Sequence, residues 1–312
     1  MRTMPATDLQ ISPFVLGGNV FGWTADKTES FAVLDAYLES GGTMIDTADA
    51  YARWLNLGGG ESETLLGEWM TSRGVRDQVL IATKVGKNEG LEGLGAATIN
   101  EAVDRSLARL QTDHIDLYYA HSDDESTPIE QTLTAFDSLV QNGKVRYLGA
   151  SNFTAARLTE SLVFSRTNNM AAYVALQPLY NLVARADYEK NLAPVCVAEK
   201  VGALPYYGLA AGFLTGKYRT NPDTESARSD RMTGHQNPHD EGVLDAVLQI
   251  AGQHSVHPAA VALAWLATRP GVVAPIASAR TPQQLQDLVA MVDLELTDDD
   301  CHRLDSASQP AA

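Results

Sequence analysis

Residues 79–121 read VLIATKVGKNEGLEGLGAATINEAVDRSLARLQTDHIDLYYAH and contain one complete strand–helix–strand unit. The apolar runs at residues 79–82 and 115–119 have the length of buried parallel strands. Between them, Val103, Leu107 and Leu110 recur at helical spacing, and Thr98 followed by Glu101 predicts a capping box near the start of the helix. Such a unit predicts a parallel sheet covered by helices.

The same pattern repeats along the chain. A second helix is predicted to begin at Pro128 and to end at Asn142 and Gly143. Eight strand–helix units in succession predict a single (β/α)8 TIM barrel over residues 1–312. The eight predicted strands are residues 14–16, 43–45, 79–82, 115–119, 145–148, 173–176, 203–204 and 272–276.

A doubly wound open sheet is the alternative architecture. Its usual G-x-G-x-x-G turn after the first strand is missing, since residues 16–22 read LGGNVFG. A long polar insertion at residues 217–241 exceeds an ordinary connection and is expected to be a disordered loop or a functional lid. After Thr297 we expect a short helix and then a frayed tail over residues 306–312.

Composition excludes several classes of protein. The chain has 312 residues, of which 45% are hydrophobic and 20% are charged, as in globular proteins. A net charge of -16 disfavours nucleic-acid and membrane partners, because both are anionic. Cys196 and Cys301 stand alone, so neither a disulfide framework nor a metal site is expected. No signal peptide or spanning segment is visible, so a cytoplasmic protein is expected, and nothing indicates an oligomeric state.

Four polar residues follow consecutive predicted strands. Asp46 follows the second strand, Tyr51 lies five residues later, Lys84 ends the third strand and His121 ends the fourth. The carboxyl ends of barrel strands form the active site of this fold, so we expect the four side chains to converge. Taken singly, each has a simpler interpretation: a loop cap, a packed aromatic, a surface charge and a core histidine. Taken together, they favour a catalytic site.

Their chemistry suits the reduction of a carbonyl group. Hydride transfer leaves an alkoxide that must be protonated, and Tyr51 can supply the proton if an adjacent cation lowers its ordinary pKa of about 10. Lys84 is the obvious cation, and Asp46 can balance its charge. A neutral His121 can hydrogen-bond the carbonyl oxygen and orient the substrate.

These residues lie in motifs that resemble the aldo-keto reductase family over nearly the whole chain. Residues 41–51 (GGTMIDTADAY), 82–84 (ATK) and 116–121 (DLYYAH) are similar to the family's aspartate–tyrosine, lysine and histidine segments. The resemblance implies that the four residues are a catalytic tetrad and that the cofactor is NADP(H). Residues 177–182 (QPLYNL) and the long insertion resemble the bacterial branch related to potassium-channel β subunits.

The resemblance also implies a cofactor site. Ser151, Asn152 and Gln177 resemble the residues that hold the nicotinamide carboxamide, and Tyr206 resembles the aromatic that stacks on the ring. A helix cap at residues 151–152 and a packed aromatic at Tyr206, with Tyr207 as its neighbour, are the simpler interpretations.

Residues 208–217 (GLAAGFLTGK), with Leu209, Gly212 and Lys217, resemble the pyrophosphate-binding loop. Arg228 in the insertion would close over the cofactor, or would simply be solvated.

The segment after the eighth strand resembles the family's adenosine site. Ser278, Arg280 and Gln284 are its matching residues, and a guanidinium at Arg280 suits a 2'-phosphate, which favours NADPH over NADH. Two departures concern this part alone. Residues 276–278 read IAS where the family often has Ile-Pro-Gly, and Leu288 stands where an asparagine often contacts the adenine.

Aromatic residues near the first two strands suggest a substrate wall. Phe21, Trp23 and Trp54 follow these strands and would either contact the substrate or pack the mouth of the barrel. The predicted function is NADPH-dependent reduction of aldehydes or ketones to alcohols by direct hydride transfer, with Tyr51 as the general acid. Two alternatives are a redox-sensing regulatory subunit with slow turnover and a specialised sugar or enone reductase.

Overall fold

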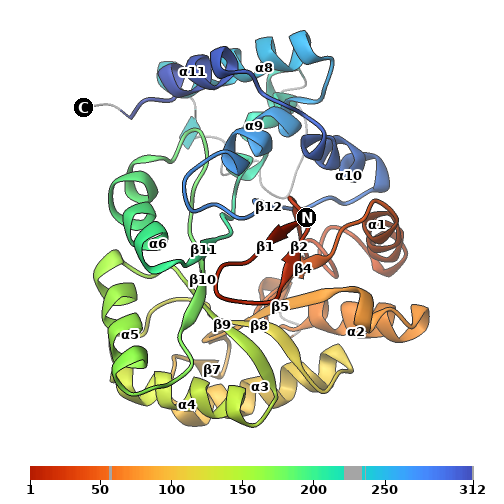
Figure 1. Cartoon of the computed structure of the whole chain (residues 1–312). Helices are drawn as coiled ribbons and strands as arrows, with labels where there is room; N and C mark the ends of the chain where they lie inside the picture. The colour runs from red at the N-terminus through yellow and green to blue at the C-terminus, as the bar shows by residue number, and fades with distance from the viewer. Residues whose placement is uncertain (56–57, 221–233, 236, 311–312) are drawn as a thin grey trace.

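The structure of the protein is a computed structural model that describes residues 1–55, 58–220, 234–235 and 237–310. A parallel sheet forms its centre, with the strand order β11-β10-β9-β8-β5-β4-β3-β12 (Figure 1). All eight predicted strands have a counterpart in the sheet, but the eighth, predicted at residues 272–276, consists of a single bridge at Val272 and a short strand at residues 276–277. The strands of the sheet are β3 (Val15–Gly17), β4 (Met44–Asp46), β5 (Leu80–Val85), β8 (Ile115–Ala120), β9 (Val145–Ser151), β10 (Tyr173–Gln177), β11 (Gly202–Ala203) and β12 (Ile276–Ala277).

Backbone contacts join the two ends of this sheet. Ala203 of β11 pairs in parallel with Val272, and the Val273 N–H donates to the Ala203 carbonyl at 2.8 Å. The Ile276 N–H donates to the Pro205 carbonyl at 2.9 Å. These bonds close the sheet, which confirms the predicted (β/α)8 barrel and brings all strand ends to one mouth.

Helices surround the sheet (Figure 1). One predicted start is wrong: α3 begins at Ala96 after Gly95, so Thr98 lies inside it and forms no capping box with Glu101. The Ile99 N–H already donates to the Gly95 carbonyl at 3.0 Å, which starts the helix earlier. The helices are α1 (Lys27–Glu39), α2 (Glu61–Arg73), α3 (Ala96–Leu110), α4 (Ile129–Gln141), α5 (Ala155–Thr167), α6 (Ala193–Glu199), α7 (Lys217–Thr220), α8 (Pro238–His254), α9 (Pro258–Ala267), α10 (Pro282–Val289) and α11 (Asp298–Ala307).

Both ends of α4 agree with the prediction from the sequence. The helix α4 follows Pro128 and is capped by Asn142, as predicted.

Among the described residues, none of the helices combines the length and the apolar character that a membrane span requires.

Two short hairpins were not predicted, because strands of two residues carry no periodicity. The first, β1 (Arg2–Thr3) with β2 (Gln10–Ile11), packs at the amino-terminal end of the barrel. Met4 between these strands is fully buried, and a Cβ on Gly202 would lie 2.3 Å from its sulfur. Glycine at position 202 therefore makes room for the hairpin. The second hairpin, β6 (Lys87–Asn88) with β7 (Leu91–Glu92), follows β5.

The predicted loop at residues 217–241 is shorter at both ends than expected. Its first four residues form α7, and residues 238–241 form the first turn of α8, which Asn237 caps. Residues 221–233 and 236, including Arg228, lie outside the described residues.

The predicted tail is also partly wrong. The helix α11 continues to Ala307, and Ser308 after it is buried. The Ser308 hydroxyl accepts a hydrogen bond from Arg185 at 2.6 Å and donates to the Leu304 carbonyl, which holds the end of the helix in place.

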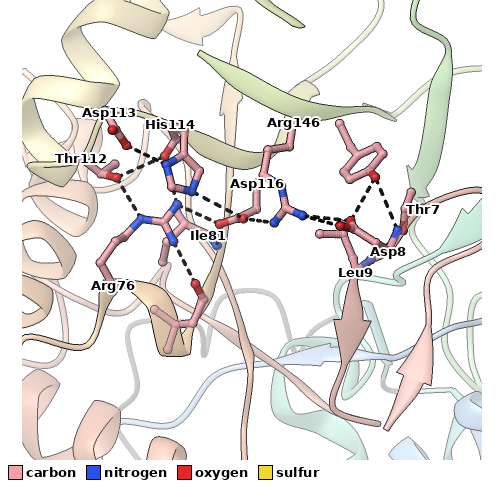
Figure 2. A network of polar contacts seen from close by, with 12 residues as sticks. Thr7, Asp8, Leu9, Arg76, Ile81, Thr112, Asp113, His114, Asp116 and Arg146 are labelled. Carbon is pink, nitrogen blue, oxygen red and sulfur yellow. Dashed lines mark hydrogen bonds and ion pairs between the residues drawn. The ribbon is translucent and has the colours of Figure 1, made fainter. Parts of the chain in front are cut away.

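A charged network holds the amino-terminal ends of the strands (Figure 2). Asp116 of β8 is 1% exposed. Its carboxylate accepts hydrogen bonds from Arg76 at 2.9 Å, from the Ile81 N–H at 2.9 Å and from Arg146 at 2.7 Å. Arg146 also pairs with Asp8, in the connection between β1 and β2. One buried charge thus ties the first hairpin to strands β5, β8 and β9.

We predict that Asp116→Asn lowers the free energy of unfolding by about 2 to 4 kcal/mol, because it leaves two guanidinium groups without their buried counter-charge. The loss stays below that of a fully buried pair, since Arg76 and Arg146 are 19% and 36% exposed. Urea unfolding measures it. Asp113→Asn, at a carboxylate that is 95% exposed, is the control and should change stability by less than about 0.5 kcal/mol. Equal losses in both variants would contradict the prediction.

Candidate active site

The ammonium group of Lys84 lies at the centre of the barrel mouth. Lys84 is on β5 and is 0% exposed. Its Nζ donates to Asp46 Oδ2 at 2.7 Å, to the Thr47 carbonyl at 2.6 Å and to the Tyr51 hydroxyl at 3.0 Å. The three N–H donors thus have three acceptors. Burial lowers the pKa of Lys84, and the charge of Asp46 opposes this shift.

The carboxylate of Asp46 is held from two sides. Its Oδ1 accepts a hydrogen bond from Gln177 Nε2 at 2.8 Å, across the barrel from β10, and its Oδ2 binds Lys84. The Tyr51 hydroxyl lies 3.4 Å from the same Oδ2. Since Asp46 is 2% exposed, protein groups fix its orientation.

Tyr51 lies in the loop between β4 and α2. The Gly60 N–H donates to the Tyr51 carbonyl at 3.2 Å. Gly60 has a left-handed backbone (φ 89°), and a Cβ there would lie 2.4 Å from Nε of Arg109 on α3. The loop therefore packs closely against the helix layer, and this contact helps to hold Tyr51 over Lys84.

His121 follows β8 and completes the group of four. The backbone N–H of His121 donates to the Val85 carbonyl at 2.9 Å, and the imidazole ring lies edge-on to the Tyr51 ring, with centroids 6.2 Å apart. Burial lowers the pKa of His121 well below its ordinary value, and the charges of Lys84, Lys87 and Arg53 add to this shift. Its imidazole is therefore neutral at neutral pH. The structure thus brings together all four side chains that the sequence singled out.

The predicted carboxamide residues form one hydrogen-bonded chain. Asn152 Nδ2 donates to the His121 carbonyl at 2.8 Å, and Asn152 Oδ1 accepts from the Tyr206 hydroxyl at 2.8 Å. The Ser151 hydroxyl donates to the Gln177 carbonyl at 2.9 Å. Asn152 Nδ2 also donates to the Ser151 hydroxyl, and Gln177 binds Asp46, so a continuous path of hydrogen bonds links Tyr206 to Asp46.

Tyr206 joins this chain through its hydroxyl group. The neighbouring Tyr207 packs edge-to-face on the Tyr206 ring, with centroids 5.2 Å apart, and its backbone carbonyl accepts a hydrogen bond from Asn181 at 2.9 Å.

The segment after β11 forms a series of tight turns. Its backbone is left-handed at several positions, and Leu209 accepts hydrogen bonds from Gly212 and Leu214 that tighten the turn. A Cβ on Gly212 would lie 3.3 Å from Nζ of Lys217. The absence of a side chain at Gly212 thus lets the Lys217 ammonium lie close to the backbone of this turn, and a positive charge beside exposed backbone suits a phosphate. The left-handed residues are Tyr207, Ala210, Ala211, Gly212 and Gly216.

The residues after β12 lie at the start of α10. The backbone N–H of Arg280 donates to Gln284 Oε1 at 3.0 Å, and the Ser278 hydroxyl donates to Asn19 Oδ1 at 2.5 Å. The guanidinium of Arg280 makes no hydrogen bond or ion pair within the described part of the chain. Leu288 is 4% exposed and belongs to the hydrophobic core, which gives a packing reason for this departure from the family.

The predicted aromatic wall is only partly present. Phe21 is 0% exposed and packs in the hydrophobic core, so it presents no surface to a substrate and its assignment to the wall is wrong. Trp23 and Trp54 pack edge-to-face with centroids 5.0 Å apart, and Trp54 is 46% exposed. These two rings join the loops after β3 and β4.

Two polar contacts of the site were not predicted. The Thr47 carbonyl binds Lys84, and Asn19 binds Ser278. A backbone carbonyl leaves no sequence signal, whereas Asn19, two residues after β3, could have been found by inspecting polar residues at strand ends.

Comparison with known proteins identifies the family. The family model described as Aldo/keto reductase family matches residues 13–309. The chain belongs to the aldo-keto reductase family. Norsolorinic acid reductase B of Aspergillus parasiticus is 32% identical to this aldo-keto reductase, over 97% of this chain and 82% of the relative. Aldo-keto reductase YhdN of Bacillus subtilis is 33% identical (95% and 88%), and aryl-alcohol dehydrogenase GME11368 of Pestalotiopsis microspora is 30% identical (96% and 80%).

The family assignment has two consequences. Aldo-keto reductases are oxidoreductases that generally use a nicotinamide cofactor, and the Lys217 ammonium beside the turn at Gly212 matches the charge of its phosphates. The narrower placement in the branch related to potassium-channel β subunits stays a prediction.

For this aldo-keto reductase we predict that the His121 imidazole stays neutral well below pH 6.5, whereas His239, whose pKa Asp240 raises, stays protonated above it. The chemical shifts of the imidazole nitrogens in an NMR titration report the protonation of both histidines. Since only the unfolded chain binds a proton at position 121 near pH 6.5, this residue lowers stability as the pH falls below that value. His121→Gln should lack this part of the acid destabilisation. Protonation of His121 at or above pH 6.5 would contradict the prediction.

Proposed function

We propose that the protein reduces aldehydes or ketones to alcohols with NADPH, and that Tyr51 donates the proton. One observation carries the proposal: the Tyr51 hydroxyl lies 3.0 Å from the fully buried ammonium of Lys84. A buried cation at hydrogen-bond distance favours the phenolate over the phenol, so it helps the tyrosine to release its proton.

The chain's own residues divide the remaining work. The nicotinamide cofactor, when bound, supplies the hydride. Lys84 stabilises the negative charge left on Tyr51, and Asp46, oriented by Gln177, balances the charge of Lys84. A neutral His121 has one ring N–H, which can donate to the carbonyl oxygen and hold it near the Tyr51 hydroxyl. Protonation of that oxygen yields the alcohol.

Hydrogen-bond capacity supports the proposed carboxamide site. Gln177 uses one amide N–H on Asp46, which leaves its second N–H and its oxygen. Asn152 uses both amide hydrogens on His121 and Ser151, which leaves one lone pair on its oxygen beside the Tyr206 contact. We assign these remaining donors and acceptors to the nicotinamide carboxamide, and the ring of Tyr206 to the nicotinamide face.

The rest of the cofactor extends over the next two strand ends in this proposal. Leu209, Gly212 and Lys217 hold the pyrophosphate, and Ser278, Arg280 and Gln284 hold the adenosine end. The guanidinium of Arg280 has no protein partner in the described part of the chain, so it can bind a 2'-phosphate in the bidentate manner that arginine favours.

We further propose that the carbonyl carries an aromatic or other large apolar substituent. The edge-to-face pair of Trp23 and Trp54 offers a partly exposed apolar surface beside the loop of Tyr51. One relative is named an aryl-alcohol dehydrogenase, which agrees with this substrate class.

Tyr51→Phe is expected to lower kcat for carbonyl reduction by at least about 100-fold while leaving NADPH affinity nearly unchanged, because it removes the proton and little else. Nicotinamide absorbance with a panel of aryl and alkyl aldehydes measures the first quantity, and fluorescence titration measures the second. Tyr147→Phe, which removes a hydroxyl that binds Asp8 away from the strand ends of the site, is the matched control. Wild-type turnover by Tyr51→Phe would rule out Tyr51 as the donor.

Arg280→Met should weaken NADPH binding by about 10- to 100-fold and leave NADH binding unchanged, since only NADPH has the 2'-phosphate that pairs with the guanidinium. Calorimetric titration of each cofactor measures the difference. Arg166→Met, at a largely exposed arginine on α5, is the control. An equal loss for both cofactors would show that Arg280 does not read the 2'-phosphate.

A further inference from the structure

One carboxyl group beside the tetrad has no part in the proposed mechanism. Asp49 lies three residues after Asp46 and two before Tyr51, and it is 1% exposed. Its N–H donates to the Lys84 carbonyl at 3.3 Å, so the residue is attached to the strand that carries the ammonium. Neither carboxylate oxygen has a hydrogen-bond partner of normal geometry within the described part of the chain. A buried carboxylate in this state is strongly disfavoured.

The cations near Asp49 are already paired with other acids. Arg109 on α3 binds Glu63 on α2 at 2.7 Å, and Glu63 is 0% exposed. Lys84 on β5 binds Asp46 at 2.7 Å. Asp49 is therefore a third acidic residue under the electrostatic influence of two cations that each have an acidic partner.

These surroundings favour a neutral Asp49. Burial raises the pKa of Asp49 to about 8, and the charge of Glu63 adds to the shift. Arg109, Lys84 and the Ala50 N–H act in the opposite direction but are weaker. The nearby titratable group on β8 is Tyr118, whose hydroxyl is also buried without a hydrogen-bond partner among the described residues.

We infer that Asp49 is a positioning residue that carries a proton in the resting enzyme and, once it releases that proton to solvent, becomes a second counter-charge to Lys84. The effect on Tyr51 rests on the proposed function. While Asp49 is neutral, the ammonium acts on the Tyr51 hydroxyl with only Asp46 to offset it. Ionised Asp49 offsets it further, so Tyr51 holds its proton more firmly.

The protonation of Asp49 is testable without any reaction, by comparing the unfolding of the wild type with that of Asp49→Asn. In the unfolded chain the carboxyl ionises near its ordinary pKa of 3.8, whereas in the folded chain it ionises near 8. The wild type therefore loses stability as the pH rises between these values, and Asp49→Asn does not. The melting temperature of the variant relative to the wild type should rise steadily over this range and then level off.

Asp77→Asn, at an exposed aspartate between α2 and β5, is the matched control and should show a flat difference. A flat difference for Asp49→Asn as well would overturn the inference. Infrared difference spectra at pH 7 provide a second measurement that needs no unfolding. They should show the carbonyl stretch of a protonated carboxyl group in the wild type and its loss in Asp49→Asn, and the absence of this band would also overturn the inference.

The coupling to Tyr51 predicts a change in the pH profile of carbonyl reduction. In Asp49→Asn no second counter-charge forms, so Tyr51 should lose its proton at lower pH and the alkaline limb of kcat should shift to lower pH. An unshifted limb, or a shift to higher pH, would overturn the coupling. If neither the wild type nor Asp49→Asn reduces any carbonyl, that result contradicts the proposed function. It leaves the protonation of Asp49 to be decided by the unfolding and infrared measurements, which need no reaction.

Discussion

The complete burial of the Lys84 ammonium is the constraint on which the site depends. A charge removed from water costs several kcal/mol unless close partners satisfy it. Here the partners are Asp46, the Thr47 carbonyl and Tyr51, all from β4 and the loop that follows it. They reach Lys84 because β4 and β5 pair in a register that sets Asp46 opposite Ala82. Strand pairing in the barrel thus places the Tyr51 hydroxyl beside Lys84.

The two ends of the barrel differ in how far their buried polar groups are satisfied by hydrogen bonds. At the amino-terminal end, Asp116 is satisfied by three donors and joins the first hairpin to the sheet (Figure 2). At the carboxyl end, Asp49 and Nδ1 of His121 are buried without hydrogen-bond partners among the described residues. Unsatisfied polar groups reduce stability, and they are tolerated where a ligand or a proton is to be handled. This contrast agrees with stability at one end of the barrel and chemistry at the other.

The proposed cofactor site and the proposed proton donor belong to one polar network. Tyr206 reaches the backbone of His121 through Asn152, and Gln177 binds Asp46 from the opposite wall. A ligand that orders Asn152 and Gln177 would therefore also restrain the groups around Lys84. In the proposed function, this connection is a physical route by which cofactor binding would prepare the site for the carbonyl.

The sequence alone determined the alternation of strands and helices, the approximate positions of the strands, the helices near residues 98–110 and 128–142, and the four candidate residues at strand ends, because apolar runs, helical spacing and position at a strand end are local properties. Only the tertiary structure decided the closure at Ala203 and Val272, the first hairpin and the burial of Phe21. The same holds for the lowered pKa of His121 and the raised pKa of Asp49, since both shifts arise from burial and charges that depend on distant segments. The bond between Asp46 and Gln177 joins residues 131 positions apart, and no local pattern encodes such a contact.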